Sequence, residues 1–369
     1  MLELINFSCI LSKNMLSKSK LMPLMRLKLL RFVLFLAIQT VWSPIHSQKD
    51  KHQDKPRLQF LAGYGIPALQ SNIGSPIDEI TRFTYIQNQS GYTLREERGS
   101  RGAGAMFSLN MSWPLKKLPG LSLGIECNAL RSSKVFNAER VIDTGFIEYR
   151  GRQDSYTQMV SLSPYVEIST NLGKFRPYIS FGPYLPIFGQ TWVELDLYDE
   201  TGLLAETYLP LIDPALQGLN EDTEALGTSI IIDVDIQAKT RGGLSLGFKS
   251  KAGFDYALSP RIGILAQVDF VALAVPSLNT TITQATLQGT PSQIEVGRAL
   301  GYTTLRDVYT EADLPMIIRE ISYQNTLDQN SNSSYNVERR DQALERLSFR
   351  DPYHTATFQL GLRYSLGKK

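Results

Sequence analysis

Apolar and polar residues alternate with a period of two along eight segments of this chain. The clearest example is the C-terminal stretch 354–369, HTATFQLGLRYSLGKK. Its even-numbered residues from Phe358 to Leu366 are apolar or aromatic, and its odd-numbered residues from Thr357 to Ser365 are polar or glycine. Because side chains of a β-strand point alternately to its two faces, this pattern predicts a strand with one apolar and one polar face.

The connections between the expected strands alternate between short and long. We expect strands at 57–68, 102–113, 121–130, 157–170, 175–188, 244–258, 262–273 and 354–369. Tight turns at 114–120, 171–174 and 259–261 alternate with long loops at 67–101, 131–156, 189–243 and 274–352. This places every long loop at one end of the structure, as in outer-membrane barrels with short periplasmic turns and long surface loops. A soluble β-sandwich, the alternative fold, has no reason to segregate its loops by length.

The fold class we predict is therefore all-β: a closed antiparallel up-and-down transmembrane β-barrel of eight strands with long extracellular β-ribbon loops. Some long inserts keep the strand pattern. Val193, Leu195 and Leu197 continue the outward, odd-numbered face of the strand at 175–188, and Ile232 to Ala238 continue the outward, even-numbered face of the strand at 244–258. We interpret them as ribbons that rise above the membrane. The alternative is an extra spanning hairpin, which would give ten strands.

The N-terminus predicts export. Residues 25–47, MRLKLLRFVLFLAIQTVWSPIHS, have a basic start, an apolar run and a small residue, Ser47, before a cleavage point. The apolar run is shorter than the ~20 residues of a membrane-spanning helix. We assign 1–47 to a signal peptide, with 1–24 upstream of the true start as an alternative, and 48–56 to a short periplasmic lead. Residues 57–369 then form the barrel, in the outer membrane of a Gram-negative bacterium.

Charge and cysteine content narrow the function classes. Residues 1–47 hold six of the 38 Lys and Arg residues and one of the 36 Asp and Glu residues, so the mature chain has 32 basic and 35 acidic residues. A nucleic-acid binder would show a basic surplus, so we expect no nucleic-acid partner. Cys127 is the only cysteine of the mature chain, which excludes an intrachain disulfide. With two histidines left, His52 and His354, a histidine-based metal site is not expected.

The polar faces of the expected strands carry balanced charges among many Gly and Ser residues. A narrow eight-stranded barrel is filled by its own side chains, and buried charges there need partners. We predict a charge network in the lumen, formed by Glu126, Glu167, Lys249, Lys251, Asp255, Asp269 and Arg363. Aromatic residues near strand ends fit the girdles at the two membrane interfaces. These are Tyr64, Trp113, Phe175, Tyr256 and Tyr364.

No catalytic, cofactor or metal site emerges from the sequence. Glu126 and Glu167 could form an acid/base pair, but ion pairing with the lumen cations explains them better. His354 has no nucleophile motif such as G-x-S-x-G to act with. The acidic residues between 194 and 224 lack the D-x-[DN]-x-[DN]-G calcium loop.

Three features together carry a family resemblance: the signal ending at Ser47-Gln48, the hairpin PYVEISTNLGKFRPYISFGPY at 164–184, and the final LGLRYSLGKK. With the eight alternating strands, they resemble the outer-membrane β-barrel domains of Bacteroidota, in the broad PorT-like and OmpA/OmpX-like class of small barrels. The resemblance covers 57–369 and concerns architecture. The chain departs from it at the C-terminus, which ends on Lys369 where such chains commonly end on an aromatic residue.

We expect a non-catalytic barrel with a plugged lumen that acts as a structural or interaction protein, or as an accessory subunit of an outer-membrane assembly. Its expected partners are outer-membrane lipid, the barrel-assembly machinery during biogenesis, and a surface or outer-membrane protein. Two alternatives stay open: an outer-membrane lipid-modifying enzyme and a narrow channel.

Overall fold

The computed structural model describes residues 55–68, 71–72, 83–143, 145, 148–201, 230–291, 305–333, 339 and 341–366. The predicted signal peptide, 1–47, and most of the predicted lead, 48–56, lie outside the described residues. Within the described ranges, no helix is both long and apolar enough to cross a membrane.

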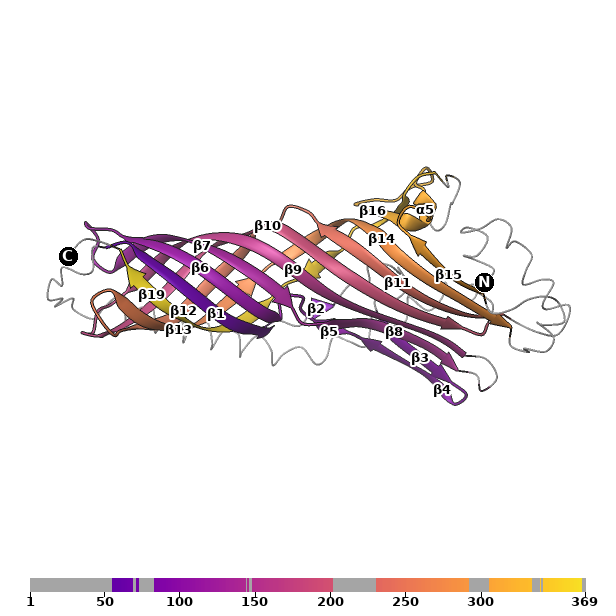
Figure 1. The fold of residues 1–369 in the computed structure, drawn as a ribbon, viewed down its shortest axis with the longest axis horizontal. Helices are drawn as coiled ribbons and strands as arrows, with labels where there is room; N and C mark the ends of the chain where they lie inside the picture. Colours follow the sequence, from indigo (N-terminus) through magenta and orange to yellow (C-terminus); the bar gives the residue numbers. More distant parts are fainter. Residues whose placement is uncertain are drawn as a thin grey trace, which may run out of the picture. The chain divides into compact units, whose positions relative to one another are not determined.

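Eight strands close into a barrel in which every neighbouring pair is antiparallel (Figure 1). In order around the barrel they are β1 (Arg57–Pro67), β6 (Gly104–Pro114), β7 (Leu121–Ser132), β9 (Glu148–Ser169), β10 (Phe175–Asp199), β12 (Gly247–Ala257), β13 (Ile262–Ala272) and β19 (Thr355–Ser365). The pairing of β19 with β1 closes the ring. The predicted eight-stranded barrel is therefore confirmed, and the alternative of ten spanning strands is wrong.

The three predicted tight turns all lie at the same end of the barrel. Gly120 (φ 85°) ends the turn between β6 and β7, and Gly173 (φ 72°) lies in the turn between β9 and β10. Both occupy the left-handed region that favours glycine. Between β12 and β13, the backbone N–H groups of Leu258 and Ser259 both donate to the carbonyl of Ile262, at 3.0 Å each. These local hydrogen bonds fix the hairpin registers.

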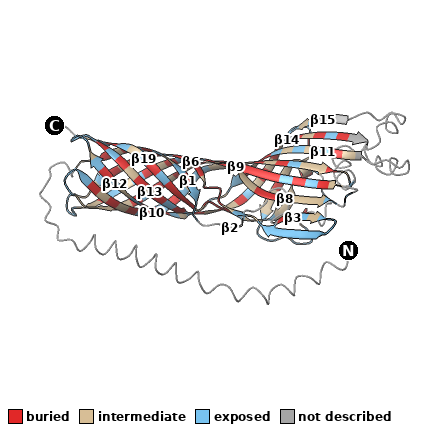
Figure 2. Cartoon of the chain, turned by 90° about the horizontal axis from the view of Figure 1, so that it is seen from below, coloured by how far each residue is buried: buried red, intermediate tan, exposed pale blue. Residues whose placement is uncertain are grey.

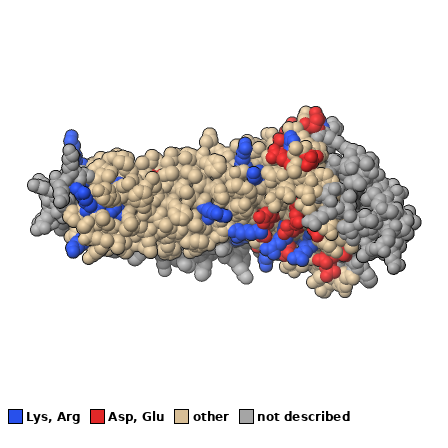
Figure 3. All heavy atoms as spheres, in the orientation of Figure 1, with Lys and Arg blue, Asp and Glu red and all other residues tan. Residues whose placement is uncertain are grey.

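The barrel strands turn their apolar faces outward and their polar faces inward, which is the reverse of a soluble β-sandwich. Large apolar side chains on the outside are half to two-thirds exposed, such as Phe60 (54%), Phe107 (61%) and Leu360 (68%), whereas charged side chains on the inside are buried. Figure 2 shows buried and exposed residues alternating along the barrel strands. Figure 3 shows a wide band of the barrel surface almost free of charged side chains, with Lys and Arg gathered near the turn end and mixed charges at the other end. An apolar belt of this kind is stable only against hydrocarbon. The chain is an outer-membrane β-barrel.

Beyond the barrel, β9 and β10 continue into a second, open sheet at the end opposite the short turns, which we call the extracellular extension. Its other elements are β3 (Phe83–Asn88), β4 (Gly91–Glu96), β8 (Val135–Asp143), β11 (Ile230–Gly242), β14 (Ala274–Pro291), β15 (Leu305–Thr310), α5 (Met316–Arg319), β16 (Glu320–Gln324), β17 (Leu344–Leu347) and β18 (Arg350–Pro352). Two short strands, β2 (Ser71–Asn72) and β5 (Arg98–Gly99), pair separately. The sheet runs β4-β3-β8-β9-β10-β11-β14, and β3 joins β8 in parallel.

The extracellular extension has a hydrophobic core of its own. Its buried members are Val193, Leu195, Ala238, Ile282, Ala285 and Leu314. Leu314, just before α5, brings the segment between β15 and β16 onto the strands of the sheet. The long inserts are therefore ordered ribbons in their described parts, as predicted, because each buries apolar side chains against its neighbours.

The predicted orientation of these ribbons was wrong. Val193 is 1% and Leu195 is 8% exposed, so they point inward and do not continue the outward face of the barrel strand. The reason is a register shift between Pro186 and Phe188, where β10 carries a β-bulge against β9. One extra residue exchanges the two faces of a strand. The side chains of β11 are likewise inverted relative to β12, so that the even-numbered Ile232 is 1% exposed.

Asp196 and Asp235 form an unfavourable pair on the outer face of this ribbon, directly opposite each other on β10 and β11. The pKa of Asp196 lies above its usual value, because burial disfavours the carboxylate and because Asp235 shares a hydrogen bond and adds negative charge. A raised carboxyl pKa in the folded state means that this pair contributes stability below the usual Asp pKa. That contribution is lost as the pH rises through the raised value.

We therefore expect Asp235→Asn to slow amide hydrogen exchange of the β10–β11 ribbon at pH 7, and this effect to disappear below the usual Asp pKa of ~3.9. Asp233→Asn, two residues away and opposite Tyr198, is the matched control and should change exchange less. Equal effects of the two substitutions, or an effect of Asp235→Asn that grows as the pH falls, would contradict the assignment.

Candidate functional site

The interior of the barrel is the candidate functional site, because it holds most of the buried charge. The structure places all seven predicted lumen residues on the inward faces of β7, β9, β12, β13 and β19, each at most 8% exposed. They form two separate clusters. Two further cations, Arg57 and Arg176, belong to the second cluster and were not among the predicted residues.

The first group, the two-lysine cluster, consists of Glu126, Asp269, Lys249 and Lys251. The ammonium of Lys249 lies 2.6 Å from one oxygen of Glu126 and 2.7 Å from Asp269. The other oxygen of Glu126 lies 2.8 Å from Lys251. Lys249 also donates to the amide oxygen of Asn128 at 3.1 Å. Two carboxylates and two ammonium groups balance, and Glu126 bridges both lysines.

The second group, the three-arginine cluster, lies nearer the short turns and consists of Glu167, Asp255, Arg57, Arg176 and Arg363. Arg176 donates to Glu167, and Arg57 lies 3.7 Å from the same carboxylate oxygen. Arg363 pairs with Asp255 at 2.8 Å, and Arg176 approaches Asp255 at 3.9 Å. Three guanidinium groups face two carboxylates, and the planar forks of arginine suit such shared, multidentate pairing.

The alternation of the strands could have revealed both missed arginines. Phe175 and Pro177 were assigned to the outward face of their strand, which puts Arg176 inward. In the strand predicted at 57–68, the apolar residues Leu58 and Phe60 share one face, which puts Arg57 on the other. They stand at strand ends, where side-chain direction is hardest to judge from sequence. Their contacts with Glu167 explain why that carboxylate is tolerated at 1% exposure.

Amide and hydroxyl side chains link strands across the lumen. Tyr178 donates to Gln267 at 2.7 Å, Gln267 donates to Gln359 at 2.7 Å, and Gln359 donates to Ser108 at 2.9 Å. This series of hydrogen bonds runs from β10 through β13 and β19 to β6. Gln267 also donates to Asp269 at 2.7 Å, which connects it to the two-lysine cluster. Such side-chain networks fix one arrangement of a polar interior.

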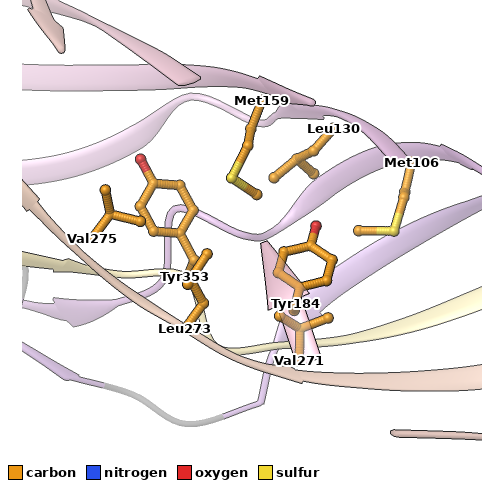
Figure 4. Packing of buried hydrophobic residues seen from close by; sticks show 8 residues of the cluster. All are labelled: Met106, Leu130, Met159, Tyr184, Val271, Leu273, Val275 and Tyr353. Atoms are coloured by element: carbon orange, nitrogen blue, oxygen red, sulfur yellow. The ribbon is translucent and has the colours of Figure 1, made fainter. Parts of the chain in front are cut away.

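An apolar layer lies beyond the two-lysine cluster, on the side of the extracellular extension. Figure 4 shows its eight side chains directed toward one another: Met106, Leu130, Met159, Tyr184, Val271, Leu273, Val275 and Tyr353. Tyr184 is fully buried, with the ammonium of Lys249 6.0 Å from its ring centre. Further out, Arg101 pairs with Asp351 at 2.7 Å, and both are buried. The lumen is thus filled by successive charged, apolar and charged layers.

The predicted interfacial aromatics all lie on the outside and are between 38% and 54% exposed. Four are near the short turns: Trp113, Phe175, Tyr256 and Tyr364. Tyr64 lies near the outer end of β1, where its hydroxyl forms a 2.6 Å hydrogen bond with Ser133. A further aromatic pair, not among the predicted residues, lies at the outer end: Tyr156 and Trp192 stack with their ring centres 5.2 Å apart. Whether these residues form a membrane girdle stays a prediction.

The chemistry that the lumen can perform is limited by its packing. Every carboxylate of the two clusters contacts at least one cation. Among the described residues, no group of three His, Cys, Asp or Glu side chains is arranged to hold a metal ion. His354 is half-buried just before β19, and its carbonyl accepts a hydrogen bond from the N–H of Ala68 at 3.2 Å. The charged side chains of the lumen are therefore buried and held by one another.

No family model matches the chain, and no curated protein matches it. Among solved structures, the outer membrane protein OprG from Pseudomonas aeruginosa is similar at 11% identity and a TM-score of 0.30, over 86% of this chain and 98% of that one. A major outer membrane protein from Thermus thermophilus is similar at 10% identity and a TM-score of 0.28, over 84% of this chain and 99% of that one. Similarities this slight carry no argument about activity.

Proposed function

We propose that this barrel is a non-catalytic outer-membrane protein that presents its extracellular extension to a surface or outer-membrane protein partner, as an interaction protein or accessory subunit. Two observations together support the proposal: buried, paired charges inside the barrel and an ordered extension with its own hydrophobic core. Paired charges fill the interior of the barrel, and the longest inserts form a folded extension outside the membrane. As part of this proposal, we expect the chain to belong to the small outer-membrane barrels of Bacteroidota that its sequence resembles.

The hairpin of β3 and β4 is the part of the extension best suited to contact a partner. Every residue of β4 is exposed, and Tyr92 (68%) and Leu94 (57%) are exposed aromatic and apolar side chains on one face. Tyr85 of β3 stacks with Tyr92 at 6.1 Å between ring centres. Exposed aromatic residues on a rigid platform are typical of interaction hot spots.

Ion pairs beside the hairpin restrict what can bind. Arg95 and Glu97 are 2.7 Å apart, and Arg98 and Glu96 are 2.6 Å apart. Charged side chains along a sheet edge discourage nonspecific strand pairing. We therefore expect recognition through the aromatic face.

The test is native purification of a C-terminally tagged chain from outer membranes in mild detergent, with mass spectrometry of proteins present at equal stoichiometry. The double variant Tyr92→Ser/Leu94→Ser should lose the partner, whereas Val308→Ser, at a similarly exposed site (55%) on β15, should keep it. A barrel that purifies alone, or a partner retained by the double variant, would contradict the proposed docking surface.

Conductance provides an independent test of the obstructed lumen. We expect no steady ion current from the folded wild-type chain in planar bilayers, because ions would have to displace buried, paired charges at a cost of several kcal/mol. A steady current that Lys249→Met changes in size or ion selectivity would instead favour the narrow-channel function. Acyl release from phospholipid or lipid A by the purified barrel would favour the enzyme alternative.

A further inference from the structure

The ladder of the barrel wall is interrupted between β10 and the segment that joins β11 to β12. The β10–β12 ladder ends at Tyr184 paired with Gly247, and the β10–β11 ladder begins at Gln190 paired with Arg241. Between these pairs, residues 185–189 face residues 242–246 without ladder pairing. The bulge at Pro186–Phe188 lies in this interval. We call it the wall opening.

A cavity of about 190 Å³ lies at the wall opening. On the outside it is lined by residues of both edges, including Ile187, Phe188 and Leu244. On the inside it reaches Met159, Val275 and Tyr353, which all belong to the apolar layer of the lumen. Ligand pockets for whole small molecules usually measure ~300–1,000 Å³. This cavity therefore suits part of a molecule.

The surface around the wall opening is apolar. Leu244 is 98%, Leu246 is 70% and Ile187 is 59% exposed. Ile187 follows the short turn at Lys174 by 13 residues on β10, which places it ~30 Å along the barrel axis for a tilted strand, near the top of an apolar belt ~25 Å tall. A molecule that enters the wall opening from this side therefore comes from the outer leaflet, near the boundary between lipid headgroups and acyl chains.

The inside and the rim together indicate what the occupant is. At the level of the wall opening, the apolar side chains of Met159, Val275 and Tyr353 lie beside the hydroxyl groups of Thr191, Thr240 and Ser277. The carboxylate of Asp351, which also lines the cavity, is paired with Arg101. Just beyond the opening, Arg241 on β11 is exposed, and Lys239 lies two residues further along the same face. A largely apolar slot, in which the one carboxylate is ion-paired and the outer rim carries cations, complements a lipid that has a hydrocarbon tail and an anionic head.

We propose that the wall opening binds one acyl tail of an anionic, phosphate-bearing lipid of the outer membrane. The tail lies against Met159, Val275 and Tyr353, and the phosphate lies beside Arg241. This lipid site is independent of the proposed protein partner. It gives the apolar layer a role beyond obstructing the lumen.

The test uses the full chain folded into phosphatidylcholine vesicles that contain a small fraction of phosphatidylglycerol with a diazirine on its acyl tail. After illumination, mass spectrometry maps the cross-linked residues. Cross-links to the inward-facing Met159, Val275 and Tyr353 are expected, in addition to links to the outward-facing Leu360, which reports ordinary lipid contact. Absence of inward links in the wild-type chain overturns the proposal.

Variants make the test specific. A side chain at Gly189 has room and would extend toward Met159, so Gly189→Leu should fill the cavity. Inward links should fall about tenfold, corresponding to a loss of ~1.4 kcal/mol of binding, while links to Leu360 stay unchanged. Ala252→Leu, which adds bulk on the outward face of β12, is the matched control. Equal inward labelling of Gly189→Leu and wild type overturns the proposal.

Two further arms complete the design. If Gly189→Leu fails to fold, judged by loss of the gel shift between unboiled and boiled samples, Ser277→Leu tests the same cavity from β14. Arg241→Gln should lower inward labelling by phosphatidylglycerol but not by a diazirine phosphatidylcholine. Inward labelling by a free diazirine fatty acid without labelling by either phospholipid overturns the proposal in favour of a free amphiphile.

Discussion

Glu126→Gln is expected to destabilise the folded barrel by about 3–5 kcal/mol, because it removes the carboxylate that bridges two buried ammonium groups. Lys249 would keep Asp269 at 2.7 Å, but Lys251 would lose its ion-pair partner in an interior where its ammonium is shielded from water. The measurement is the free energy of unfolding from urea titrations in detergent micelles or vesicles, followed by the gel shift of the folded form.

A double variant separates loss of the ion pair from loss of packing. In Glu126→Gln/Lys251→Met the remaining Lys249 and Asp269 balance, so this variant should be more stable than Glu126→Gln alone. Glu96→Gln, which breaks the exposed pair with Arg98, serves as the surface control and should cost about 0–1 kcal/mol. A double variant that is less stable than the single variant would show that the charges are not coupled as described.

Leu314→Ala is expected to loosen the extracellular extension while leaving the barrel intact. Leu314 is 3% exposed and packs in the cluster that includes Val193, Leu195 and Ile282. Truncating a buried leucine to alanine costs about 2–5 kcal/mol, through lost transfer free energy and the cavity left behind. Because this cluster belongs to the extension alone, the effect should be confined to it.

Limited proteolysis of the barrel in whole outer membranes can detect this local loosening. Cleavage between β15 and β16 should become faster in Leu314→Ala, while the gel shift of the folded barrel persists. Leu347→Ala, at a residue of the same insert that is 51% exposed, should leave the cleavage rate near that of wild type. Loss of the gel shift in Leu314→Ala would show that the extension and the barrel unfold as one unit.

The barrel itself could be read from the sequence because its signals are local. Period-two alternation assigns the two faces of each strand, and turns such as 171–174 set the hairpin registers. The alternation of short and long connections then placed the long inserts at one end. The charges of the lumen followed from the same alternation. Arg57 and Arg176 were missed because they stand at strand ends.

The extension was harder to predict, because its arrangement depends on a β-bulge and on long-range strand pairings, which have weak local sequence signals. A single bulged residue near Pro186 reverses the faces of β10, and alternation alone cannot place it. The β3–β4 hairpin lay within a segment assigned to a loop, although its Asn88 to Gly91 turn is a recognisable hairpin signal. The parallel pairing of β3 with β8 joins distant segments and has no signature in either.

The closure of the ring by β1 and β19 has a consequence for how the molecule is made. This seam pairs Arg57 with Ser365 at one end and Pro67 with Thr355 at the other, so it joins the first barrel strand to the last. Contacts between segments so far apart in the chain form slowly. Until the last strand has been synthesised and delivered, the first presents an unsatisfied backbone edge to any other extended chain. We therefore expect the unfinished polypeptide to depend on carriers that shield this edge during transit, and a copy truncated before Thr355 to accumulate as aggregate.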